Sequence, residues 1–190
     1  MKVRVAILLA VLASLAVAAW GVFLYGFAIG GLQATTRFSG RLSLVIFSLI
    51  FLLHPQRKET LQSILSPAYF LIFAIVHGIH LAELLSYVAL SGIQLVPIRL
   101  VGGFLAYAII FIMPWLQYRA DNQNLCEQRF RKISYVYLFY VWFVFFMTYL
   151  SRVNGTFPNA GGSYAEHVAL MAFVNVLLGV KIVRMVVMKR

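Results

Sequence analysis

The stretch PAYFLIFAIVHGIHLAELLSYVALS occupies residues 67–91 and is apolar over most of its length. A transmembrane α-helix needs about 20 mainly apolar residues, so this stretch predicts a helix that spans a membrane. It nevertheless carries three ionisable side chains within two turns, His77, His80 and Glu83. Such groups are costly in hydrocarbon and are expected to face protein or a water-filled cavity. The stretch therefore predicts a polar site inside a membrane protein.

The composition of the whole chain agrees with a membrane protein. Of its 190 residues, 63% are hydrophobic and only 11% are charged, whereas about a quarter of the residues of a soluble domain are charged. Five further segments are apolar enough, or nearly so, to cross a membrane, at residues 5–29, 41–54, 98–118, 134–151 and 164–187. The segment 41–54 is short for a span and begins at a charged residue. We predict an all-α fold in which residues 1–190 form one bundle of six transmembrane helices.

The basic residues predict the orientation of this bundle. Sixteen Lys and Arg face five Asp and Glu, which gives a formal net charge of +11. Because the charges lie between apolar segments, they indicate membrane topology and not nucleic-acid binding. Twelve of them fall on the side of the chain termini, and four fall on the other side: Arg37, Arg41, Arg99 and Arg152. The positive-inside rule therefore predicts that both termini lie in the cytoplasm.

The first apolar segment has one feature of a signal peptide. MKVR precedes an apolar run that contains Ala16-Val17-Ala18, an A-x-A cleavage pattern. The run continues through WGVFLYGFAIGG, however, and cleavage would leave a fragment too short to span a membrane. We therefore expect an uncleaved first helix. The single cysteine, Cys126, excludes an intrachain disulfide.

The polar residues of segment 67–91 form a stripe along one helix face. His77 and His80 lie about 60° apart around a helix, as do His80 and Glu83, and Tyr87 continues the stripe one turn later. Three interpretations stay open. The stripe is an internal hydrogen-bonded cluster, or His77 or His80 is an axial haem ligand. Alternatively, His77, His80 and Glu83 bind a metal ion or relay protons.

Two motifs resemble a known family. FSGRLSLVIFSLIFLLHPQRK at residues 38–58 resembles the second-helix signature of the ferric-reductase-like transmembrane family, through Gly40, Ser48, Pro55, Arg57 and Lys58, with His54 where threonine is usual. Phe73-Ala74-Ile75-Val76-His77 resembles the context of that family's haem-ligating histidine. The nearest relatives would be the haem-binding membrane subunits that partner bacterial periplasmic methionine sulfoxide reductases. The resemblance implies an inner-membrane location and a b-type haem held by His77.

The resemblance continues to about residue 152 and includes one departure. VGGFLAYAIIFIMPWL and EQRFRKISYVYL are similar to the family's fourth helix and to the approach to its fifth. In the family the fifth helix supplies two haem-ligating histidines, but here the equivalent positions fall near Ile133 or Ser134 and near Phe146 or Met147. A haem held by histidines of the third and fifth helices is therefore impossible. Other candidate ligands are Met147, His167 or a histidine of a partner chain.

Three functions follow as hypotheses. The first is an electron-transfer subunit of ferric-reductase-like architecture with a reduced haem complement. Its electrons would come from another membrane or redox protein. The second is a haem-free structural or assembly subunit of a membrane complex. The third is a small metal or proton transporter that uses His77, His80 and Glu83. The chain has no nucleophile–base pattern, so no catalytic residue is predicted. Its expected partners are the lipid bilayer and another membrane protein.

Overall fold

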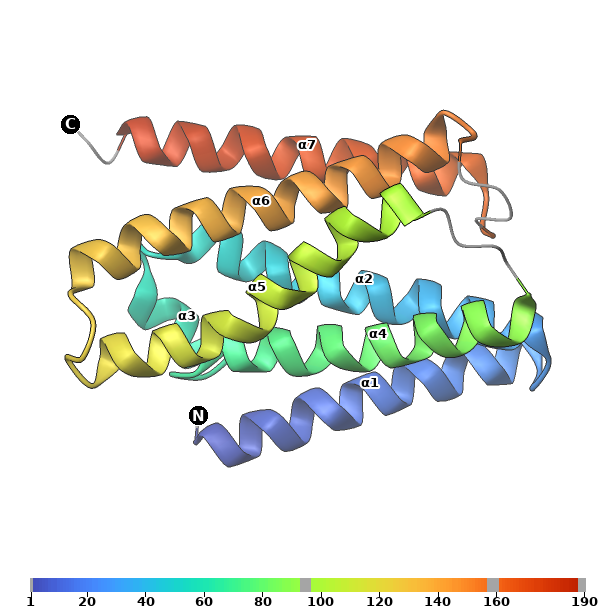
Figure 1. Ribbon diagram of the computed structural model, residues 1–190, viewed down its shortest axis with the longest axis horizontal. Helices are drawn as coiled ribbons and strands as arrows, with labels where there is room; N and C mark the ends of the chain where they lie inside the picture. Colours follow the sequence, from blue (N-terminus) through green and yellow to red (C-terminus); the bar gives the residue numbers. More distant parts are fainter. Residues whose placement is uncertain (1, 93–96, 157–160, 188–190) are drawn as a thin grey trace.

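The computed structural model (Figure 1) describes residues 2–92, 97–156 and 161–187, with side chains in the second range from residue 101 onward. Within these ranges the chain is helical and contains no β-strand. Six of the helices are long and apolar enough to cross a membrane. The prediction of an all-α, multi-pass membrane bundle is therefore confirmed. The helices are α1 (Val3–Tyr25), α2 (Ile29–Leu53), α3 (Lys58–Ile64), α4 (Tyr69–Ser91), α5 (Pro97–Asp121), α6 (Glu127–Val153) and α7 (Tyr164–Val187).

The helix α2 lies at the centre of the bundle. It contacts α1, α3, α4, α6 and α7, and half of its most apolar window is buried, the largest share among the six candidate spans. Figure 1 shows α1 and α7 at opposite edges with α2 between them. The start of α1 and the end of α7 lie at the same end of the bundle, here named the termini end (Figure 1). The α1–α2 turn lies at the other end, here named the far end.

The start of α2 differs from the prediction. The helix begins at Ile29 and not near residue 41, while α1 ends at Tyr25. Gly26 makes the turn between them with φ +78°, a conformation that favours glycine. The first turns of α2 carry polar residues that obscured the apolar signal, and the structure buries them against neighbours. For example, the Thr35 hydroxyl donates to the carbonyl of Ala18 on α1 at 3.3 Å.

The N-terminus of α4 is fixed by a side chain of α5. The Gln117 amide nitrogen donates to the Pro67 carbonyl at 2.7 Å, and its oxygen accepts from the Phe70 backbone N–H at 3.3 Å. The first backbone donors of a helix have no partner within the helix, so this side chain satisfies one of them. Gln117 thus joins α4 and α5 and sets the position of the residues that follow Phe70.

Aromatic side chains fill the middle of the bundle. Phe47 of α2 lies 5.6 Å from Phe73 of α4 and 5.3 Å from Phe145 of α6, measured between ring centroids. It also stacks on Phe51, which is fully buried. Lipid is as apolar as these rings, so helix association in a membrane depends on close packing and not on removal from water. The rings therefore fix how α2, α4 and α6 fit together next to His77.

Close packing of α1 on α2 depends on Gly21, and this is testable. A Cβ at Gly21 would lie 2.9 Å from the backbone nitrogen and 3.0 Å from the Cα of Thr35, neither of which can move easily. We expect Gly21→Leu to lower the free energy of unfolding by about 1–3 kcal/mol through overpacking. The matched control is Gly179→Leu on α7, where an added Cβ meets nothing within 4 Å. Thermal unfolding in detergent measures both, and equal stability of the two variants would contradict the packing.

Candidate functional site between α2 and α4

The two histidines of α4 are hydrogen-bonded to two serines of α2. His77 Nδ1 lies 2.6 Å from the Ser43 hydroxyl, and His80 Nδ1 lies 3.0 Å from the Ser39 hydroxyl. The serines are four residues apart on one helix and the histidines three apart on the other, so the pairs match turn for turn. The polar stripe of α4 thus faces α2 within the bundle, where each imidazole finds a partner.

A glycine makes room for this pairing. Gly40 lies between the two serines in sequence, and a Cβ there would lie 3.1 Å from Cε1 of His80. Small residues at helix interfaces let the helix backbones approach closely. Ser39, Gly40 and Ser43 therefore form a shallow surface on α2 that accepts the imidazole rings.

Aromatic rings from three helices enclose His77. Its ring stacks on Phe73 at 5.3 Å and on Tyr107 of α5 at 4.8 Å, and it meets the edge of Phe145 of α6 at 6.0 Å. These contacts occupy the side of His77 that faces α5 and α6. A haem bound by His77 toward α6 would have to displace Tyr107 and Phe145.

The residues of α6 at the family's ligand positions, and the candidate ligand Met147, have other surroundings. Ser134, at one family ligand position, is buried but bonds to His54. Phe146, at the other, stacks on Trp142 at 5.5 Å. Met147 is 40% exposed on the outside of the bundle. The residues present therefore do not fit a haem held between α4 and α6.

Glu83 and Tyr87 extend the stripe toward the far end. Oε2 of Glu83 is buried without a hydrogen-bond partner, and the Tyr87 hydroxyl accepts from Gln33 Nε2 of α2 at 2.9 Å. In the described ranges no three His, Cys, Asp or Glu side chains converge as a metal site would require. A metal site at His77, His80 and Glu83 therefore stays a prediction.

A second polar cluster, at the termini end, was not predicted. His54 is central to it, and only 2% of its surface is exposed. Its Nε2 lies 2.8 Å from the Ser134 hydroxyl, and its Nδ1 lies 2.8 Å from the Tyr69 hydroxyl. Ser134 donates its own proton to the Arg131 carbonyl, so it accepts from His54 Nε2–H. In a neutral ring that is protonated at Nε2, Nδ1 is left to accept from the Tyr69 hydroxyl.

Two basic residues of α7 cap the C-terminus of α2. Lys181, which is fully buried, donates to the His54 carbonyl and to Gln56 Oε1. Arg184 donates to the Leu52 carbonyl at 3.1 Å. The last carbonyls of a helix lack partners and carry partial negative charge, which favours cations there. In the sequence both residues belong to the twelve basic residues on the side of the termini. Their spacing of three inside an apolar segment is the feature that indicates burial.

Glu166 and His167 lie where α7 begins. Ser163 and Glu166 form a reciprocal cap, in which Glu166 N–H donates to the Ser163 hydroxyl at 3.2 Å and Glu166 Oε2 accepts from Ser163 N–H at 3.3 Å. Glu166 also forms an ion pair with Arg41 of α2. The acid therefore caps α7 and also joins α7 to α2. His167 is 6% exposed and no contact places it beside His77.

Comparison with protein-family models, with curated proteins and with solved structures finds no match for this chain. The resemblance to the ferric-reductase-like family therefore rests on the sequence motifs, and function has to be argued from the geometry.

The His54 cluster predicts a dependence of stability on pH. Burial, together with the positive charges of Lys181 and Lys58, lowers the pKa of His54 from its usual 6.5 to about 3. Between these values the unfolded chain binds a proton at His54 that the folded chain does not, so stability decreases as the pH falls. The loss from this residue reaches up to about 1.4 kcal/mol per pH unit.

Unfolding of the wild type and of His54→Gln across pH 3 to 7 measures this effect. Glutamine can still bond to Ser134 and Tyr69 but does not titrate. We expect the wild type to lose more stability than the variant as the pH falls through this window. Parallel pH profiles would show that His54 does not cause the loss.

Proposed function

We propose that this protein is a haem-free membrane protein that acts as a structural or assembly subunit of a membrane complex. The observation that carries the proposal is the packing of His77, the residue to which the family resemblance assigns haem. Its Nδ1 is bonded to Ser43, and its ring is enclosed by Tyr107 and Phe145. Packed side chains take the place at which the family would hold a cofactor.

The replacement positions on α6 support the same proposal. Ser134 has its own partner in His54, and Phe146 packs on Trp142, whose Nε1 donates to the Val174 carbonyl of α7 at 2.9 Å. Ser134 thus serves a contact between helices, and Phe146 packs on a residue that joins α6 to α7. On this proposal the ferric-reductase-like architecture has kept its helices and converted its electron-transfer site into a packed core.

The proposed location is the inner membrane, with both termini in the cytoplasm. The distribution of basic residues supports this orientation. Three of them, Arg129, Arg131 and Lys132, are exposed on the first turns of α6 at the termini end. Exposed basic residues next to a membrane attract anionic lipid headgroups or an acidic surface of a partner protein. The proposed partner is therefore a membrane protein with an acidic cytoplasmic face.

One observation favours the third hypothesis as a second candidate. The His77 and His80 rings lie 5.4 Å apart, and one oxygen of Glu83 is buried without a partner. Ionisable groups spaced along a helix in this way are typical of proton pathways. A proton or metal site along α4 is compatible with a haem-free bundle.

The absorption spectrum of the purified protein tests the haem-free proposal. After expression with a haem precursor, we expect neither a Soret band nor a reduced α band, because the rings around His77 exclude a porphyrin. A haem spectrum that is lost in His77→Ala would contradict the proposal. Metal analysis of the same sample tests the metal-binding form of the second candidate, which requires a bound metal that is lost in both His80→Ala and Glu83→Ala.

A further inference from the structure

Three arginines gather at the far end of the bundle. Arg37 and Arg41 lie one turn apart on α2, and Arg152 lies in the last turn of α6. They are close enough for their positive charges to repel one another. Like charges grouped in a partly buried place are unfavourable unless an anion offsets them. The arginines therefore predict a nearby negative charge.

Glu166 supplies one negative charge to this group. Glu166 pairs with Arg41 and is held in place by the cap at Ser163. Within the described ranges no carboxylate forms an ion pair with Arg37, whose guanidinium instead lies 5.6 Å from the ring centroids of Tyr25 and Phe38. The charge of Arg37 is therefore not offset by an ion pair.

Two unpartnered polar atoms mark a place beside Arg37. Nε of Arg37 and Nδ1 of His167 are both buried without a hydrogen-bond partner, and His167 is 6% exposed. Both residues lie beside Gly162, where a Cβ would lie 2.6 Å from Glu166 Oε2, 3.0 Å from Arg37 Nη1 and 3.4 Å from His167 Cε1. Buried polar groups in proteins nearly always have partners. Two such atoms near one glycine indicate a ligand.

We propose that Arg37, Arg152 and His167 bind a phosphate-type oxyanion below Gly162. Guanidinium groups present planar pairs of donors that match phosphate oxygens. Of the four basic residues that the charge count assigns to the side opposite the termini, three lie in this cluster, and the side chain of Arg99 lies outside those described. Binding of an anion explains why these arginines lie on the side of the membrane where the positive-inside rule disfavours basic residues.

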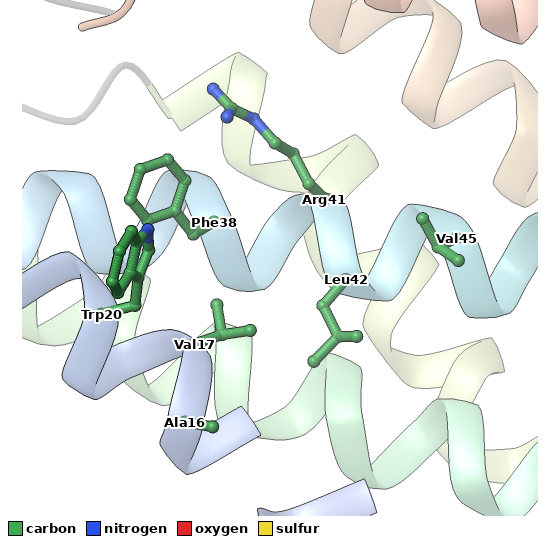
Figure 2. A pocket seen from close by; sticks show the side chains of 7 residues that line it. All are labelled: Ala16, Val17, Trp20, Phe38, Arg41, Leu42 and Val45. Carbon is green, nitrogen blue, oxygen red and sulfur yellow. The ribbon is translucent and has the colours of Figure 1, made fainter. Parts of the chain in front are cut away.

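A neighbouring groove suggests two sources for the phosphate. A groove with a volume of about 380 Å³ lies between α1 and α2. Figure 2 shows the side chains that line it: Ala16, Val17, Trp20, Phe38, Arg41, Leu42 and Val45. The Arg41 guanidinium extends away from the apolar floor of the groove (Figure 2). An acidic lipid can lay an acyl chain in the groove and bring its phosphate to the arginines. Free inorganic phosphate offers the same oxygens without a chain.

Thermal unfolding in detergent, followed by tryptophan fluorescence, tests the site. Inorganic phosphate is titrated against chloride at equal ionic strength, and phosphatidylglycerol against phosphatidylcholine. A ligand that binds only the folded state raises Tm in a saturable way. We expect a rise with phosphate, with phosphatidylglycerol or with both. A response to the acidic lipid alone would assign the lipid as the source, and a response to inorganic phosphate would assign the free anion.

Variants then connect the response to the site. Arg37→Gln should weaken the apparent Kd about tenfold or more, as expected for loss of charge-assisted hydrogen bonds. The matched control, Arg4→Gln, removes an exposed arginine at the termini end and should leave the Kd unchanged. If Arg37→Gln does not fold, Arg37→Lys keeps the charge, loses the planar donors and should also bind more weakly. No saturable rise in the wild type, or an equal rise in the Arg37 and Arg4 variants, would overturn the proposal.

Discussion

The absence of water inside a bilayer is the constraint on which this structure depends. Each polar group within the hydrocarbon has to find its partner in the protein. The central helix α2 provides those partners. Its hydroxyls at Ser39 and Ser43 receive the imidazoles of α4, while its last carbonyls are capped by Lys181 and Arg184 of α7. The other helices surround α2 because their polar side chains can be satisfied there.

The same constraint explains the arrangement of the chemistry along the bundle. The middle contains aromatic rings without polar atoms, such as Phe47, Phe73 and Phe145. The polar side chains lie nearer the two ends, with His54 and Lys181 at the termini end and the arginines with Glu166 at the far end. His77 lies where the polar stripe meets the aromatic core, so it has both a serine partner and stacked rings. Its surroundings are those of a packed residue and differ from a cofactor pocket.

Hydropathy in the sequence predicted the spans of α4 and α7 well. The segment 164–187 coincides with α7, and 67–91 nearly coincides with α4. It misplaced the start of α2 because buried polar residues such as Thr35 lower hydropathy as much as exposed ones do. The roles of His54 and Lys181 were missed for a related reason. A sequence shows which side chains are polar or charged, but it does not show which hydroxyl or carbonyl groups they contact. The hydroxyl partners of His77 and His80 come from residues 34 and 41 positions earlier, and helical periodicity carries no information on such distant pairs.

The central claim is that hydroxyls of α2 satisfy the histidines of α4, and a double-mutant cycle tests it most directly. The cycle combines Ser43→Ala with His77→Phe, because the phenylalanine ring can keep the stacking on Tyr107. Reversible unfolding in mixed micelles is the measurement. We expect the two substitutions to be coupled by about 0.6 kcal/mol, and at most about 1.7, which is typical of hydrogen bonds between membrane helices. Strictly additive effects of the two substitutions would contradict the account.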